Sequence, residues 1–408
     1  MDKFTAILAA SLLAGSASAD PVSVRLDLGG SFDWAAADSI DALLGYPTRQ
    51  TLDAKARLMW QGNAGNFGFE AHVLLGYQVG DNVGFSTALA DMMPAVSPAS
   101  FFDLSSNVYS DSRQSLTARL DRLSVSYSSQ NFVVKLGRQA VTWGSGMVFR
   151  PSDIIAPFAP NAVDTAYKPG VDMAYAQVLF DNGNDLAAVF VPRRAVAGGA
   201  LAWDQSTLAL RSTLLLGDYD GTVLLARDHG DTLFNLGLAG PLGNAAWNIE
   251  LGQWALADGS KPLNILANIS NSGMLGDMNI TYFAEYFHNG FGVDTATPLN
   301  ALPPALASRL ATGQLFNVGR DFLALGAQLG VSAAVTVSPS LISSLNDGSV
   351  FVAVQAGVSL SDNLDIGFHA SSGFGPDGTA FGGRETATGS GVFLRAPASV
   401  GLTITRYF

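Results

Sequence analysis

Charged side chains gather around one segment that is otherwise rich in proline and apolar residues. Residues 154–160 read Ile-Ile-Ala-Pro-Phe-Ala-Pro, a composition that favours a packed segment over a solvated loop. Opposite charges held at a narrow passage orient ions and solutes electrostatically, without covalent chemistry. We interpret the segment as one that folds into the interior of the molecule and narrows it; the alternative is an external loop whose prolines merely stiffen it. The charged residues expected near the narrowest point are Arg138, Arg150, Asp153, Lys168 and Asp172.

Residues suited to covalent or metal chemistry are scattered along the chain. There is no cysteine, and the four histidines show no i, i+4 spacing that would hold a metal. We find no nucleophile-elbow, phosphate-binding or dinucleotide-binding motif. A Ser/His/Asp site assembled from distant strands stays open, because such triads are defined by geometry. We therefore expect a protein that is not an enzyme and that has no cofactor and no metal.

The scaffold for these charges is predicted to be a sheet. Apolar and polar side chains alternate with period two in residues 22–29, 52–61 and 67–77, and the pattern recurs up to the C-terminus. The polar face carries six basic and six acidic residues, which predicts no strong charge preference; most are expected to be solvated or paired across strands. The pore-lining candidates among them are Arg25, Arg57, Glu70, Lys135, Arg211, Glu285 and Arg320, and the others are Asp27, Asp53, Lys55, Glu250 and Asp365.

Arg138 breaks the alternation, because it falls on the apolar face of its predicted strand. A charge in that position is costly in lipid. Gly137, directly before it, could host a β-bulge that turns Arg138 inward. We therefore expect a register shift at Gly137.

Turn signals divide the alternating stretches into about 18 strands, with about 16 as the lower bound. With an even count, every long gap between strands falls on the same side, as in outer-membrane barrels with short periplasmic turns and long external loops. We predict an all-β fold, a transmembrane antiparallel up-and-down β-barrel with both termini in the periplasm. The strands are expected to start near residues 21, 50, 66, 115, 131, 170, 184, 205, 220, 231, 244, 262, 277, 319, 334, 348, 363 and 393.

The composition fits this fold. Hydrophobic residues make up 48% and charged residues 14% of the 408 residues, yet no later apolar run reaches the roughly 20 residues of a membrane helix. The net charge of −12 argues against a nucleic-acid partner. Lys3, a short apolar core and the Ala17-Ser18-Ala19 exit predict a cleaved secretory signal peptide over residues 1–19. Residues 20–408 would then form a single barrel domain, embedded in outer-membrane lipid.

The C-terminal stretch places Val400, Leu402, Ile404 and Phe408 on one face. A terminal phenylalanine that closes an alternating strand resembles the targeting signal of bacterial outer-membrane barrels. We therefore expect the barrel-assembly machinery to be a partner that binds Phe408. Arg406 departs from the pattern, which usually has an aromatic or aliphatic residue there, although its charged head can reach the membrane interface.

A second resemblance rests on residues 136–146, Leu-Gly-Arg-Gln-Ala-Val-Thr-Trp-Gly-Ser-Gly, and on the loop residues 149–157 and 167–172. They resemble a loosely related set of proteobacterial outer-membrane porins, including alginate-export-like barrels, in which an LGRQxxxWG strand end precedes a Pro/Asp-rich loop. The specific match is confined to residues 136–172. The resemblance implies a single-chain barrel of about 18 strands, an architecture with a wide interior. It does not identify a substrate for this chain.

The favoured function is passive diffusion of small hydrophilic solutes or ions, since so wide an interior is not filled by side chains alone. The first predicted strand follows the signal peptide at once, so we expect no N-terminal plug domain. One alternative is an export conduit for a polymer such as an acidic polysaccharide, which would need periplasmic partners. Another is a structural or adhesive surface barrel whose long loops, 79–114 and 288–318, bind partners. A homo-oligomer is compatible with each.

Overall fold

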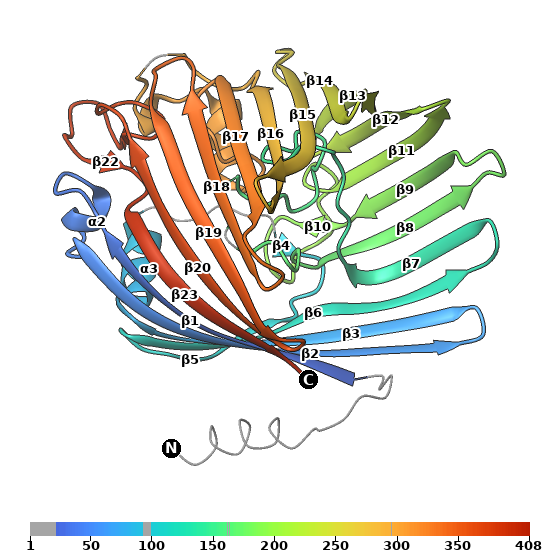
Figure 1. The fold of residues 1–408 in the computed structure, drawn as a ribbon, viewed down its shortest axis with the longest axis horizontal. Coiled ribbons are helices and arrows are strands. Elements are labelled where there is room, and N and C mark those ends of the chain that lie inside the picture. The colour runs from blue at the N-terminus through green and yellow to red at the C-terminus, as the bar shows by residue number, and fades with distance from the viewer. Residues whose placement is uncertain (1–21, 93–98, 161, 163, 295) are drawn as a thin grey trace.

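The chain forms one closed antiparallel barrel (Figure 1). The structure, a computed structural model, describes residues 22–408 except residues 93–98, 161, 163 and 295. The predicted signal peptide, residues 1–19, lies outside the described residues. The barrel has 18 long strands, as the alternation predicts. They are β1 (Val22–Trp34), β2 (Thr48–Ala64), β3 (Phe67–Gly80), β6 (Gln114–Ser128), β7 (Phe132–Gln139), β8 (Val171–Leu179), β9 (Asp185–Val191), β11 (Thr207–Leu216), β12 (Tyr219–Asp228), β13 (Asp231–Leu242), β14 (Ala245–Ala255), β15 (Leu263–Leu275), β16 (Met278–His288), β17 (Asp321–Gly330), β18 (Val335–Ser344), β19 (Val350–Ser361), β20 (Leu364–Phe374) and β23 (Ala398–Tyr407).

The predicted strand starts are confirmed to within a few residues. The largest difference concerns the last strand, which begins at Ala398 rather than near residue 393. Each strand pairs with its neighbour in the chain through antiparallel hydrogen bonds, so the topology is up-and-down.

The barrel closes where β23 pairs with β1. The register runs from Arg25 opposite Tyr407 to Trp34 opposite Ala398. The backbone N–H of Val24 donates to the Phe408 carbonyl at 3.1 Å, and the Phe408 N–H donates back to the Val24 carbonyl at 2.9 Å. The last residue of the chain is therefore part of the seam, and no strand edge is left between β1 and β23.

All long connections lie at one end of the barrel, called here the loop end, and both Val22 and Phe408 lie at the other, the turn end. This confirms the parity predicted from the gaps. One short strand departs from the up-and-down order, because β5 pairs with the loop-end half of β6 while β7 pairs with the other half. The connections also contain α2 (Ile40–Leu43), α3 (Asp81–Met92), β4 (Ala99–Ser100), β5 (Ser105–Ser110), β10 (Arg193–Arg194), η1 (Leu299–Ala301), α4 (Pro304–Ala311), β21 (Arg384–Glu385) and β22 (Phe393–Leu394).

The two faces of the wall differ as the alternation predicts. Apolar side chains such as Leu28, Leu52 and Trp60 are exposed on the outer face, while Arg25 and Arg57 between them are buried on the inner face. An apolar outer band with a polar interior is the pattern of a sheet that spans lipid. Among the described residues, no helix is both long and apolar enough to cross a membrane.

The bulge predicted at Gly137 is absent. Gly137 has a φ of +115° and Arg138 after it is buried, but β7 keeps one register with both β6 and β8. The register shift lies instead on β6, where His72 and Val73 of β3 oppose residues 122 and 120, so that Asp121 is the extra residue. The prediction was wrong because one positive φ turns Arg138 away from lipid without an inserted residue.

We predict that Gly137→Ala destabilises the barrel. The added Cβ would lie 2.2 Å from the Leu123 carbonyl oxygen, at a φ of +115° that L side chains rarely adopt. Such backbone strain costs about 1–3 kcal/mol. The temperature at which the folded barrel loses its compact mobility in SDS gels should fall. In the control Gly367→Ala, the new Cβ meets only the Thr403 carbonyl oxygen at 3.9 Å, so that temperature should not change. Equal temperatures for both variants would contradict the prediction.

Candidate constriction site

Residues 140–170 join β7 to β8 and are called here the inner loop. The first half of the inner loop bonds to inner-face residues of β14 and β16. Tyr167, near its end, contacts arginines of β1 and β2, which are far from β14 in the closed strand order. The segment therefore lies within the barrel, as the first of the two interpretations expects.

Two buried glutamates of the wall hold the first half of the inner loop. Glu250 of β14 accepts hydrogen bonds from the Ser145 N–H at 2.8 Å, the Ser145 hydroxyl at 2.9 Å and the Ser152 hydroxyl at 2.7 Å. Glu285 of β16, with 0% exposure, accepts bonds from the three consecutive backbone N–H groups of residues 147–149, at 2.6, 2.9 and 2.8 Å. Successive N–H groups form a concave anion site. The two carboxylates are therefore stabilised by the loop without a cation.

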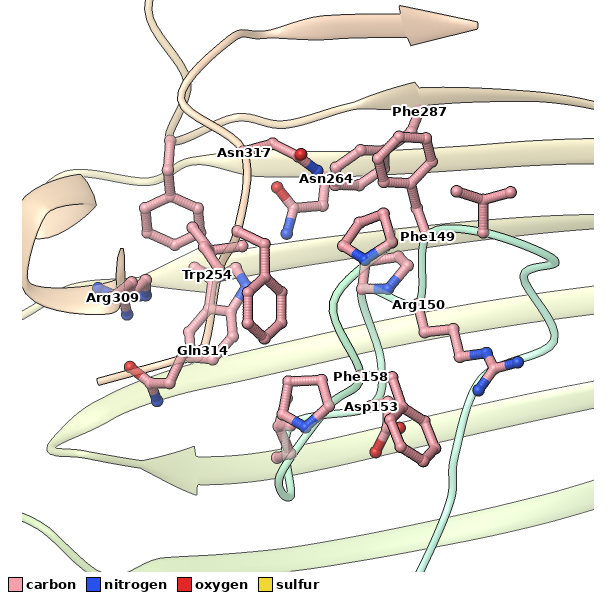
Figure 2. Close-up of a pocket in the computed structure, with 18 of the residues that line it drawn as sticks. Phe149, Arg150, Asp153, Phe158, Trp254, Asn264, Phe287, Arg309, Gln314 and Asn317 are labelled. Carbon is pink, nitrogen blue, oxygen red and sulfur yellow. The ribbon is translucent and has the colours of Figure 1, made fainter. Parts of the chain in front are cut away.

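The turn that presents these N–H groups requires a glycine at position 146. A Cβ on Gly146 would lie 1.7 Å from the Phe149 carbonyl oxygen. Phe149 then stacks on Phe287 of the wall (Figure 2), and their ring centroids are 4.7 Å apart. The cavity left between loop and wall measures about 60 Å³, room for only a few water molecules. This joint is therefore packed.

Asp153 and Lys168 form an ion pair within the inner loop. The Lys168 ammonium also donates to the Val141 carbonyl at 2.7 Å, and both charged side chains are buried. Burial raises the pKa of the Asp153 carboxyl and lowers the pKa of the Lys168 ammonium, and each charge partly offsets the shift of the other. Lys168 thus ties the end of the loop to its start at Val141 and to its middle at Asp153.

Arg138 and Asp172 close the base of the inner loop. The guanidinium makes two parallel hydrogen bonds to the carboxylate, each of 2.8 Å, and donates a third at 2.7 Å to the Phe102 carbonyl. Both side chains are buried. Their charges compensate each other, so their direct effect is to fix the ends of β7 and β8.

The extra residue of the β6 bulge, Asp121, anchors the end of the loop. Its carboxylate binds the guanidinium groups of Arg57 at 2.6 Å, Arg119 at 2.7 Å and Arg122 at 2.9 Å. It also accepts the backbone N–H of Gly170 at 3.2 Å. One carboxylate among three guanidinium groups leaves an excess of positive charge on this side of the inner face.

Tyr167 lies beside this excess positive charge. Its ring centroid is 4.3 Å from the Arg57 guanidinium carbon and 5.3 Å from that of Arg25. Contacts of this kind are favourable because the ring face is electronegative. Arg25 is also paired with Asp27 at 2.9 Å. The loop is thus held on both sides of the barrel.

Four of the predicted residues lie away from the inner loop. Glu70 and Lys135 form a 2.6 Å ion pair on the wall. Within the described part of the chain, Arg211 of β11 donates only to a neighbouring threonine hydroxyl, at 3.1 Å. Arg320, next to the loop end of β17, is paired with Asp294 at 3.0 Å. The structure does not bring these four into one site with the loop.

Arg150 differs from Lys168, the other cation of the inner loop. Its Nε donates to the Gly146 carbonyl at 3.1 Å, and its guanidinium forms no salt bridge with any described residue. Figure 2 shows the guanidinium pointing away from the aromatic joint around Phe149 and Trp254. Arg150 is therefore the cation of the inner loop whose charge is not compensated by direct contact.

Sequence reasoning missed several residues that position the loop. Glu250 was placed on the polar face but not in the site, and Asp121, Tyr167 and Asn268 were not singled out. Asn268 donates to Glu285 at 3.1 Å. The alternation of residues 247–251 puts Asn248 and Glu250 on the inner face, but no spacing signal links Glu250 to the loop. Among the described residues, no group of three or more potential metal ligands comes together.

Comparison with known proteins relates the chain to porins through its fold. No protein-family model matches, and no curated protein is similar in sequence. OccK5 (OpdH) of Pseudomonas aeruginosa superposes with a TM-score of 0.55 at 12% identity, covering 95% of this chain and 98% of that one. A BenF-like porin of Pseudomonas fluorescens Pf-5 gives 0.52 at 12%, covering 95% and 99%. OccK2 (OpdF) of P. aeruginosa, solved in complex with glucuronate, gives 0.51 at 11%, covering 95% and 97%. The chain thus has the architecture of proteobacterial outer-membrane porins.

We predict that Glu285→Ala frees the backbone N–H groups of residues 147–149. Hydrogen bonds to a charged acceptor contribute about 1.5–3 kcal/mol each, so amide hydrogen exchange there should accelerate at least about tenfold. Mass spectrometry of the exchanging protein in detergent would measure this. Glu70→Ala is the control: it removes another inner-face carboxylate, one that pairs with Lys135 and does not contact the loop. Unchanged exchange in Glu285→Ala would show that the loop is held by other contacts.

Proposed function

We propose that this chain is a porin-type channel of the Gram-negative outer membrane, through which small hydrophilic solutes and ions diffuse passively past the inner loop. The observation that carries the proposal is the attachment of the loop to Glu250 and Glu285. It supports a fixed narrowing inside a barrel that wall side chains alone cannot fill. The apolar outer band and the porin fold agree with it.

The charges at the loop support a modest preference for anions. Most cations there are paired, as in Arg25 with Asp27 and Lys168 with Asp153, so they contribute little net field. Arg150 and the excess charge around Asp121 remain positive. A fixed charge in a narrow passage between low-dielectric walls raises the local concentration of the opposite ion. We assign Arg150 the role of selecting charge in the passage.

A polymer export conduit is the second candidate, favoured by the likeness of residues 136–146 to alginate-export-like barrels. In that case the inner loop would act as a gate, and periplasmic partners would open it. The two candidates differ in whether the purified barrel conducts alone.

Two further assignments belong to this proposal. Residues 1–19 act as a cleaved signal peptide that exports the chain. Phe408 is the signal for barrel assembly; its place at the seam, bonded through its backbone to Val24, supports the link between recognition of the C-terminus and closure.

Reconstitution of residues 20–408 in a planar bilayer should give stable current steps of one size. Replacing residues 150–167 by a short Gly/Ser linker should increase the step, because the passage would widen. Resistance of the folded barrel to SDS without heating serves as the folding control. An unchanged step would contradict the constriction, and silence from folded, inserted protein would favour the gated exporter.

Arg150→Glu should shift the reversal potential in a KCl gradient toward cation preference, because it reverses the uncompensated charge in the passage. Lys261→Glu is the matched control, since it makes the same charge change on an exposed residue of the connection between β14 and β15. Equal shifts in the two variants would mean that the overall charge, and not Arg150, determines selectivity.

A further inference from the structure

The outer face of the wall carries a groove that the channel function does not use. It has a volume of about 850 Å³ and crosses β3, β2, β1, β23, β20 and β19, on both sides of the seam. Its side chains come from the outer face, where Leu52 is 63% and Phe368 49% exposed. Inner-face residues of the same strands, such as Ser31 and Gly401, lie between these outer-face residues in the sequence and also line the groove.

The strand register shows how the groove runs. One row of paired residues passes from Val79 through Leu52, Gly30 and Leu402 to Phe368 and then Ala356. The row beside it contains Gln50, Phe32, Val400, Ala370 and Val354. The groove therefore follows the hydrogen-bonding direction, across the strands instead of along them.

A missing side chain creates the floor of the groove. Gly30 has no Cβ on the outer face of β1, and the nearest side-chain atom to that position is a methyl of Leu52 at 3.1 Å. The small side chains of Ala356 and Ala370 leave the far end open, while Leu52, Leu402 and Phe368 form its sides. Nearly all of this lining is apolar, so water gains nothing by filling it.

The groove descends from the loop end of the barrel toward the middle of the membrane along its length. At β3 it includes Val79 and Gly80, the last two residues of that strand at the loop end, and at β19 it includes Val354 and Ala356 in the middle of the strand. Six strands about 4.8 Å apart span about 24 Å. With strands tilted about 35–45°, this path descends about 14–17 Å, roughly half of a 30 Å hydrocarbon core. The groove thus covers the depth of one leaflet.

The shallow end of the groove is polar. Gln50 and Arg113 line it, and the Arg113 side chain is 68% exposed. One guanidinium nitrogen of Arg113 lies 3.3 Å from Asp81, which leaves its other N–H groups available. A polar start at the membrane surface, where an arginine paired with Asp81 keeps further N–H donors, followed by an apolar path to mid-depth matches one lipid molecule, with a phosphorylated head and a fatty acyl chain.

We propose that this groove binds an acyl chain of the phosphorylated glycolipid of the outer leaflet, lipopolysaccharide, with a phosphate at Arg113. The assignment to the outer leaflet rests on the proposed outer-membrane location, because the loop end then faces the cell exterior. Lipid binding at this site would cover the wall on both sides of the β1–β23 seam. The groove lies outside the lumen, so it acts independently of conduction.

Native mass spectrometry of the intact barrel in mild detergent, titrated with purified lipid A, tests the site. Gly30→Phe fills the floor and should weaken lipid A binding about tenfold, because several methylene groups lose their contact. Gly273→Phe is the matched control: it lies on β15 outside the groove, nothing lies within 4 Å of its added Cβ, and it should bind as wild type. Arg113→Gln should weaken binding of lipid A more than binding of phosphatidylethanolamine, because the phosphate of phosphatidylethanolamine is neutralised by its own ammonium group.

Several results would overturn the proposal. Equal binding by Gly30→Phe and wild type would exclude the groove as the site. Equal affinity for lipid A and phosphatidylethanolamine would reject the outer-leaflet lipid as its occupant. Lipid-free dimers that Gly30→Phe dissociates would assign the groove to a second copy of the chain. Bilayer currents of Gly30→Phe should match wild type, so a failure of lipid binding is distinguishable from a failure of the channel.

Discussion

The structure depends on the absence of water from hydrocarbon. Inside a membrane, a backbone N–H or C=O that lacks a partner finds no replacement, so a sheet that spans lipid must close on itself. Here closure is made by β23 against β1, and the terminal Phe408 bonds to Val24 through its backbone. Closure in turn produces an interior, and period-two alternation makes that interior polar. Charged residues such as Arg57 and Asp121 can then be buried in the wall because they face each other and not lipid.

The polar interior also explains how a long connection can be held inside the barrel. A carboxylate buried alone would be expensive, and a loop buried alone would leave its N–H groups without acceptors. The hydrogen bonds from the N–H groups of residues 147–149 to Glu285 offset both free-energy costs, because each buried group is the partner of the other. The apolar residues of the same loop support this attachment, since Phe149 packs on Phe287 and Phe322 of the wall. The loop is therefore fastened by hydrogen bonds at its backbone and by packing at its side chains.

Much of the fold could be predicted from the sequence. The position of a strand, the face on which a side chain lies and the position of a turn all depend on residues that are close together in the chain. Alternation identified the strands, and gap lengths identified the side on which the long connections lie. The pairing of β5 with half of β6 escaped prediction, since its short, polar stretch shows no alternation. The site was predictable only in part. The charges around residues 138–172 could be identified, but their partners in Glu250, Tyr167 and Asp121 are set by the packing of distant segments. Spacing along the chain carries no information about such contacts.

The seam has a consequence for how the barrel is made. At the turn end, neighbouring strands are joined by turns of a few residues, so those pairings form between segments that are already close. The seam joins residues almost a whole chain apart: the Thr405 hydroxyl donates to Asp27 across 378 positions. Contacts so distant in sequence carry the largest loop-closure entropy and are slow to form. The pairing of the first and last strands is therefore expected to form last, and their edges stay unpaired until every hairpin between them has formed.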